Sequence, residues 1–293
     1  MVGEVTSGRG ASRDGFVDVP GARLYYKLRG TGPGPLLLVA PGGATDADGS
    51  DALADELADR YGHPVLTYDR RGLSRSRLDD GAPMSAVIET HADDMHRLVA
   101  AVTDRPVLVF GSSIGALISL EFAAAHPDRI RLLIAHEAAL AALLAEPDRS
   151  RVAAMQRGVE EAFEHDGILR AMQRLLEFAG DPADDPAPEI GRTMPGGRRA
   201  ARFGANLKFF LAHDVGAAHR HRLDLAALKA AAGVIVPAAG ELSRGLLPYS
   251  CTQALAAQLD RPLVEFPGGH TGYAQRPRAF AAAFERTLAE YAD

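Results

Sequence analysis

The sequence predicts an α/β fold in which a mostly parallel sheet is flanked by helices. Segments typical of strands and helices alternate through the first half of the chain and again near its end, the pattern of parallel strands joined by helical crossovers. Between these stretches the patterns are only helical. We therefore expect one core domain, residues 15–140 and 226–293, with an all-helical cap, residues 141–225, inserted after the sixth strand.

Eight segments have the character of strands. The first two alternate apolar and polar residues, and the Pro20–Gly21 pair between them predicts an antiparallel hairpin. The other six are short and largely apolar, as expected for strands covered on both faces. In chain order the eight segments are 15–19, 22–30, 35–41, 64–69, 105–111, 129–137, 232–240 and 261–269.

Helical patterns separate these strands and fill the cap. In chain order they are 46–60, 85–102, 114–126, 151–165, 167–180, 198–213, 249–259 and 276–292. The first begins in TDADGSD (45–51), which lacks the regular spacing and the distal glutamate of a calcium loop, so we expect a capped helix start there. Asp69 and Arg71 follow the fourth strand and are expected to fix a loop through ion pairs and hydrogen bonds.

The composition excludes several classes of protein. The 293 residues carry a formal net charge of −6, so no basic face for nucleic acid is expected. No apolar run approaches the roughly 18 residues that span a bilayer, and residues 1–14 have the character of a flexible tail. Cys251 is the single cysteine, so an intrachain disulfide is impossible. We expect a cytoplasmic monomer or homodimer without nucleic-acid or membrane partners.

Two adjacent serines lie between glycines where the fifth strand meets the next helix. The sequence Gly111-Ser112-Ser113-Ile114-Gly115 fits the pattern G-x-S-x-G. A sharp strand-to-helix turn forces its middle residue into strained backbone geometry, and the flanking glycines let strand and helix approach closely. The middle hydroxyl then projects above a helix N-terminus, where negative charge is favoured. Ser113 is therefore the candidate nucleophile, and Ser112 is expected to point elsewhere.

Four segments together resemble the α/β-hydrolase fold family. They are LLLVAPGG (36–43), TYDRRGLSRS (67–76), GSSIG (111–115) and VEFPGGHTGY (264–273). They look like the family's oxyanion loop, its Asp-x-Arg-Gly segment, its nucleophile elbow and its Gly-His segment. The resemblance covers about residues 15–140 and 226–293. It implies an eight-stranded α/β-hydrolase sheet with a serine-based catalytic triad and no cofactor.

The resemblance implies that His270 is the catalytic base. A serine hydroxyl needs an adjacent base to act as a nucleophile near neutral pH. His270 follows the last strand and two glycines, in the family's chain order of serine, acid and histidine. The cap segment HDVGAAHRH (213–221) holds three further histidines, but it lacks the regular spacing and the carboxylate cluster of a metal site. We expect no metal.

The acid of the triad departs from the family's usual pattern. Relatives commonly place an aspartate three residues beyond a glycine after the seventh strand, but counting from Gly240 this position holds Ser243. Glu241 lies two residues earlier, and Glu137 ends the sixth strand, where haloalkane dehalogenases of this family carry their acid. We favour Glu137, because a carboxylate at an apolar strand end needs a cationic or hydrogen-bonding partner. Glu241 is the alternative acid, and a site without an acid is a third possibility.

The remaining site residues are expected beside the nucleophile and in the cap. The resemblance implies an oxyanion hole formed by the backbone N–H groups of Gly43 and Ile114, with Ala44 beside them. The apolar side chains of the cap predict a mostly apolar acyl pocket. Phe209 and Phe210 are candidates for its wall, and His213 is a further candidate for contact with a ligand.

Together these features predict a serine hydrolase that cleaves a small, apolar carboxylic ester, lactone or thioester through an acyl-enzyme. Ser113 attacks, His270 moves the proton and Glu137 orients the histidine. The same triad also serves C–C bond hydrolases, perhydrolases and acyltransferases, and a non-catalytic ligand-binding protein is a further alternative. Epoxide hydrolase and dehalogenase chemistry needs an aspartate at the elbow, so Ser113 argues against both.

Overall fold

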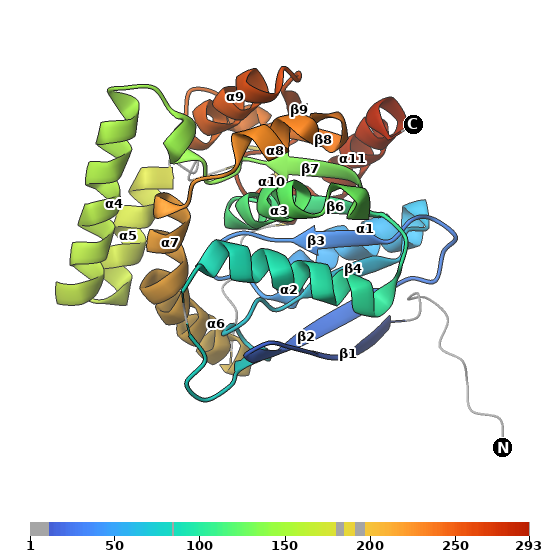
Figure 1. Ribbon diagram of the computed structural model, residues 1–293, viewed down its shortest axis with the longest axis horizontal. Coiled ribbons are helices and arrows are strands. Elements are labelled where there is room, and N and C mark those ends of the chain that lie inside the picture. Colours follow the sequence, from blue (N-terminus) through green and yellow to red (C-terminus); the bar gives the residue numbers. More distant parts are fainter. Residues whose placement is uncertain (1–11, 84, 180–184, 191–196, 293) are drawn as a thin grey trace.

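A computed structural model describes residues 12–83, 85–179, 185–190 and 197–292, without the side chains of residues 178, 179 and 198. Within these residues the centre of the molecule is a nine-stranded sheet in the order β1-β2-β4-β3-β6-β7-β8-β9, with β5 paired to β2 (Figure 1). The strands are β1 (Ser12–Val19), β2 (Ala22–Arg29), β3 (Leu37–Ala40), β4 (Val65–Tyr68), β5 (Arg77–Leu78), β6 (Val107–Ser112), β7 (Ile130–His136), β8 (Ile235–Gly240) and β9 (Val264–Phe266). Strand β2 pairs antiparallel with β1, β4 and β5, and all other pairs are parallel. The predicted α/β-hydrolase sheet is confirmed.

Two details of the sheet differ from the prediction. The described sheet has nine strands instead of eight, because Arg77 and Leu78 form the two-residue strand β5 against β2. Two residues are too few to produce a periodic pattern in the sequence. The predicted tail, residues 1–14, is also shortened, since Ser12 to Asp14 belong to β1 and pair with β2. Residues 1–11 lie outside the described residues.

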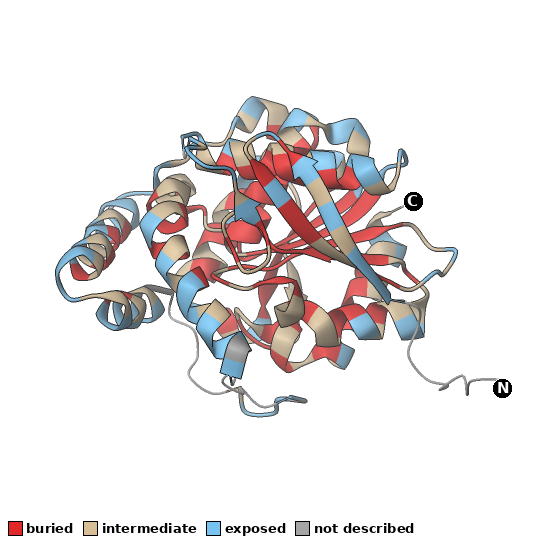
Figure 2. Ribbon diagram, turned by 90° about the horizontal axis from the view of Figure 1, so that it is seen from below, coloured by how far each residue is buried: buried red, intermediate tan, exposed pale blue. Residues whose placement is uncertain are grey.

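Each face of the sheet is covered by its own helices. Side chains such as Leu38 and Val109 point toward α2 (Val87–Val102), α3 (Ile114–Ala125) and α9 (Leu247–Leu259). Their strand neighbours Leu37 and Phe110 point to the opposite face, toward α1 (Asp51–Tyr61) and α11 (Pro277–Tyr291). Figure 2 shows the resulting buried central strands between partly exposed helices. Burial on both faces explains why these strands have continuous apolar sequences.

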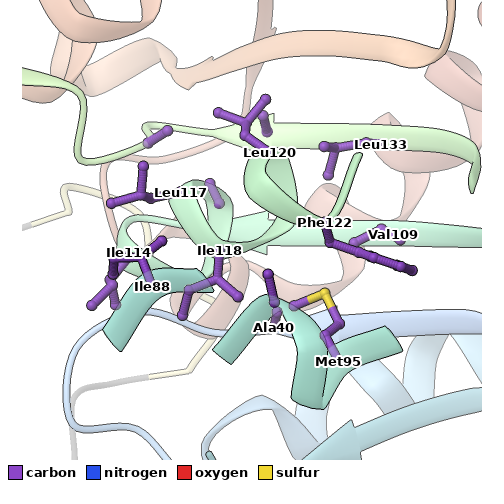
Figure 3. Close-up of a cluster of buried hydrophobic side chains, with 14 of the residues drawn as sticks. Ala40, Ile88, Met95, Val109, Ile114, Leu117, Ile118, Leu120, Phe122 and Leu133 are labelled. Carbon is purple, nitrogen blue, oxygen red and sulfur yellow. The ribbon is translucent and has the colours of Figure 1, made fainter. Parts of the chain in front are cut away.

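The helix that follows the double serine is almost wholly buried. In Figure 3, Leu117 and Ile118 of α3 lie among side chains of β3, β6, β7 and α2. Its aromatic residue Phe122 lies beside Val109 of β6 and is fully buried. Packing on several sides leaves the helix little freedom to shift. The position of Ser113, immediately before the helix, is therefore fixed by the core.

The cap lies at one end of the sheet (Figure 1). It follows β7, the sixth strand by the predicted numbering. It contains α4 (Asp148–His165), α5 (Ile168–Ala179), α6 (Gly197–Phe209), a π-helical turn (Phe210–Asp214) and α7 (Val215–Arg220). The next helix, α8 (Leu225–Ala230), packs against α3 and returns the chain to the core. None of the helices within the described ranges combines the length and apolar character that crossing a bilayer requires.

The turn before α3 depends on glycine at position 115. A Cβ atom on Gly115 would lie 2.0 Å from the carbonyl oxygen of Ala40, which is backbone of β3 and cannot move aside. We expect Gly115→Ala to lower the free energy of unfolding by about 3 kcal/mol. Gly204→Ala is the matched control, because Gly204 lies in α6 with open space around it. That variant should gain up to about 1 kcal/mol. Equal stabilities of the two variants in urea melts would contradict the close packing at Gly115.

Candidate active site

Ser113 occupies a strained turn between β6 and α3. Its backbone has φ 55° and ψ −123°, a conformation that residues other than glycine rarely adopt. Its N–H donates to the carbonyl oxygen of His136 at 3.0 Å, which ties the turn to the end of β7. Ser112 is buried as the last residue of β6, whereas Ser113 is partly exposed. The turn thus leaves Ser113 the more exposed of the two serines.

Glu137 and His270 form a short hydrogen bond at the carboxyl ends of the strands. Glu137 directly follows β7 and has φ 47°, another strained value for a residue with a side chain. Its Oε2 accepts from Nδ1 of His270 at 2.6 Å, and its Oε1 accepts from the N–H of Gly240 at 2.8 Å. Because the carboxylate can only accept, the histidine proton lies on Nδ1. The lone pair of Nε2 is then the one that can take a proton.

The carboxyl group of Glu137 is strongly held in its ionised form. It is 1% exposed, and burial by itself would raise its pKa. The hydrogen bond from His270, together with the positive charges that His136 and His270 carry at low pH, outweighs burial and lowers the pKa of Glu137 to about 2. A carboxylate that stays ionised can stabilise a protonated imidazole throughout the neutral range.

Glu241 and Ser243, in the loop after β8, have other surroundings. Glu241 accepts from Nη1 of Arg276 at 3.2 Å and, more weakly, from the N–H of Gly268 at 3.4 Å. Ser243, at the family's usual acid position, is fully buried. Its hydroxyl helps to lower the pKa of Glu137, although no hydrogen bond of ordinary geometry links it to any described residue. The geometry therefore places Glu137, and not Glu241, against the histidine.

His136 is a buried histidine that the sequence does not mark. Its ring packs against Phe110, Phe266 and Phe280, with centroids 5.5 to 6.2 Å apart. Full burial lowers its pKa to about 4, so the ring is neutral at pH 7. Its backbone, rather than its ring, serves the site, because its carbonyl oxygen accepts the N–H of Ser113.

Two backbone segments pass beside Ser113, the start of α3 and the loop after β3. Ile114 is the first residue of α3, so its N–H has no acceptor within the helix. Gly43, in the loop after β3, has φ 59°, which glycine adopts without strain. A Cβ atom on the neighbouring Gly42 would lie 2.5 Å from the Cβ of Ser113, so this loop runs directly past the serine.

One cavity brings the predicted catalytic residues together. It has a volume of about 350 Å³ and is lined by Ser113, His270 and Glu137. The predicted neighbours Gly43, Ala44, Ile114 and Phe210 also line it. Most of its wall is apolar, and the cap contributes Met172, Leu175, Phe203, Leu207 and Val215 to it. A volume of this size suits a small organic molecule.

Phe209 and His213 differ from the prediction, because neither lines the cavity. The ring of Phe209 covers Gly72, where a Cβ atom would lie 2.1 Å from it. His213 packs on Phe209, with ring centroids 4.6 Å apart. Consecutive helical residues point about 100° apart, and here Phe210 faces the cavity while Phe209 faces Gly72. Of the other cap histidines, His221 contacts Glu121 at 2.9 Å, and no three potential metal ligands gather within the described residues.

A buried ion pair links the loop after β3 to the cap. Arg70 donates to the carbonyl oxygens of Gly43 at 2.7 Å and Pro41 at 3.3 Å, and to Oδ2 of Asp214 at 2.8 Å. Asp214 ends the π-helical turn and also contacts Nε2 of His91 at 3.3 Å. Burial by itself would raise the pKa of Asp214, but Arg70 and His91 lower it. Sequence patterns gave no sign of this link, because its members are far apart in the chain.

Removing the charge of Asp214 should destabilise the protein strongly. We expect Asp214→Asn to lower the free energy of unfolding by about 3 kcal/mol, because Arg70 would keep a buried and uncompensated charge. Asp93→Asn provides the control, since Asp93 pairs with Arg97 on the exposed side of α2. It should cost less than about 0.5 kcal/mol. Urea denaturation of both variants measures the difference, and a similar small loss in each would contradict the expected role of Asp214.

The family model described as the α/β hydrolase fold matches residues 35–177, a segment that contains Gly43, Ser113 and Glu137. The uncharacterized hydrolase YraK of Bacillus subtilis is 36% identical over 272 residues, which are 92% of this chain and 93% of that protein. A Pseudomonas aeruginosa structure assigned as an epoxide hydrolase has a TM-score of 0.69 at 18% identity and covers 98% of both chains. A bacterial membrane phospholipase A has a TM-score of 0.68 at 20% identity, covering 96% of this chain and 86% of that one. At such identities the two structures share the fold alone.

Proposed function

The chain belongs to the α/β-hydrolase fold family, and we propose that it is a serine hydrolase of small carboxylic esters, lactones or thioesters. In this proposal Nε2 of His270 takes the hydroxyl proton while Oγ of Ser113 attacks the carbonyl carbon of the substrate. Glu137 holds the imidazole in the required tautomer and stabilises its protonated form. The developing oxyanion is bound by the N–H groups of Gly43 and Ile114.

The second half of the reaction returns the enzyme to its starting state. His270 gives its proton to the leaving alcohol or thiol, and the acyl group stays on Ser113. The same imidazole then takes a proton from water, whose oxygen attacks the acyl carbon. Collapse of that intermediate breaks the bond to Oγ, releases the acid and returns the proton to Ser113. No group outside the chain and water is required by these steps.

One observation gives the proposal its main support. The hydrogen bond of 2.6 Å between Glu137 and His270 lies in the same cavity as Ser113, whose backbone is strained at the tip of a buried turn. A carboxylate, an imidazole and a projecting hydroxyl in one cavity are the parts that acyl transfer needs. Epoxide opening in this family needs an aspartate at the elbow, so Ser113 supports ester-type chemistry instead.

A panel of p-nitrophenyl esters with graded acyl length tests the proposal directly. We expect turnover that is blocked by a fluorophosphonate, with the label on the peptide that carries Ser113. The cavity of about 350 Å³ favours short to medium acyl chains over long ones. If no ester, lactone or thioester is hydrolysed and Ser113 takes no label, the proposal fails and a ligand-binding role replaces it.

A further inference from the structure

The part of the cavity wall that the cap supplies is apolar except for two polar side chains. Among the described cap residues that line the cavity, these are Gln156 of α4 and His219 of α7, and the two helices pack against each other. Their neighbours in the wall include Met172, Leu207 and Phe210. Ser113 and His270 come from the core instead, so the two cap residues form a separate polar group within the same cavity.

Gln156 is buried with most of its hydrogen-bonding capacity unused. The residue is only 3% exposed. Its one hydrogen bond within the described residues is long, 3.4 Å from Nε2 to Oε1 of Glu160 on the same helix. A primary amide has two donors and two acceptor positions. Leaving most of them unpaired in an apolar wall is unfavourable, which points to a partner that the chain itself does not supply.

His219 of the neighbouring helix offers a second neutral polar group in the same cavity. Its ring forms no hydrogen bond with the described residues, and it lies between the main cavity and a smaller hollow of about 230 Å³. Burial, followed by the charge of Arg222, lowers the pKa of His219, so the ring is neutral at pH 7. A neutral imidazole donates from one nitrogen and accepts at the other.

We propose that Gln156 and His219 bind an uncharged hydrogen-bonding group of the substrate, and that a secondary amide is the group that fits best. The inference rests on the proposed function and narrows it to esters that carry an amide. The amide of Gln156 can donate to a carbonyl oxygen and accept from an N–H, so it is complementary to another amide. Both side chains are neutral, so they match an uncharged hydrogen-bonding group better than a charged one.

Matched pairs of esters test this subsite. One pair compares the p-nitrophenyl ester of γ-acetamidobutyric acid with its isosteric all-carbon analogue. A second pair places the same acetamido group in the alcohol part of a hexanoate ester. In the pair whose amide reaches the two cap residues, we expect kcat/KM to be about tenfold higher for the amide-bearing ester. Its alkyl isostere leaves the side chains of Gln156 and His219 unpaired.

Variants then assign that preference to the cap residues. Gln156→Met and His219→Leu should each reduce the ratio of kcat/KM within the preferred pair toward one. Met172→Leu, which changes the apolar wall, is the control and should change both members of the pair alike. A wild-type ratio of one in both pairs, or a ratio that neither Gln156→Met nor His219→Leu alters, would overturn the inference while the proposed function stands. If the protein hydrolyses neither member of any pair and Ser113 takes no fluorophosphonate, both proposals fall together.

Discussion

Ser113→Ala should lower kcat for an activated ester by a factor of about 10⁶, the scale on which removal of a catalytic serine acts. The variant would keep the cavity, the oxyanion donors and the Glu137–His270 pair, but it would have no atom to carry the acyl group. A residual acceleration of about 10³ over water is expected from binding and oxyanion stabilisation alone. Steady-state kinetics measure the loss of turnover, and fluorophosphonate labelling measures the loss of the reactive hydroxyl.

Ser112→Ala is the matched control for this experiment. Ser112 also lines the cavity, but it is 1% exposed as the last residue of β6 and does not occupy the strained turn. Its replacement should leave labelling in place and lower kcat far less than the change at Ser113. If the two substitutions reduce turnover equally, or if the label appears on Ser112, then the turn does not select the nucleophile as its geometry indicates.

Glu137→Gln should lower kcat by about 10⁴, because an amide does not supply the negative charge that stabilises the imidazolium. The amide of the variant can also present an N–H to Nδ1 of His270, which favours the tautomer with its proton on Nε2. That tautomer cannot accept the proton of Ser113. The test is the ratio of kcat between the wild type and the variant on the same ester.

Glu241→Gln is the control for the acid, since Glu241 contacts Arg276 and not His270. We expect it to change kcat by no more than about twofold, the scale of a change at a surface ion pair. A large loss with Glu241→Gln, together with near-normal turnover by Glu137→Gln, would show that the loop after β8 moves to supply the acid.

The low pKa of Glu137 also predicts how stability depends on pH. Its pKa is about 2 in the folded protein and 4.5 ordinarily. A group whose folded pKa is depressed contributes stability above its unfolded pKa and loses it as pH falls through the folded value. The wild type should therefore lose on the order of 3 kcal/mol between about pH 5 and pH 2 from this group. Glu137→Gln should lack that component, and urea melts at several pH values would detect its absence.

The sheet could be predicted from the sequence because its central strands are short and apolar, and because helices of clear periodicity separate them. Both faces of each central strand are buried, so Leu37 and Leu38 are both apolar although they point in opposite directions. Strand β5 could not be predicted, since two residues have no period. A capped start was predictable at residues 45–51, and Asp46 does cap a 3₁₀ turn, Ala47–Ser50, by accepting from the N–H of Asp48. The α-helix itself begins only at Asp51 and has no side-chain cap.

The candidate site likewise has residues that could be predicted from the sequence and residues that could not. Ser113 was predictable because a local turn fixes its geometry, and Glu137 because a carboxylate at the end of an apolar strand requires a partner. The cap was harder, since the choice between Phe209 and Phe210 depends on the rotation of one helix against the core. Gln156 and Arg70 carry polar side chains that a hydrophobic pattern assigns to the surface. Only the folded chain shows that both are buried.

The hydrogen bonds of Arg70 and Asn206 have a consequence for how the cavity can be reached. Asn206 of α6 donates to the carbonyl oxygen of Ala44. Arg70 donates both to Asp214 of the cap and to the carbonyl oxygen of Gly43. Any outward swing of this half of the cap must break these bonds or drag the loop after β3 with it. Hydrogen bonds of α4 and α5 side chains, in the described part of the chain, stay within the cap. Within the described residues, side-chain hydrogen bonds thus tie one half of the cap, α6 and the π-helical turn, to the loop after β3, whereas the half formed by α4 and α5 can move without pulling on that loop.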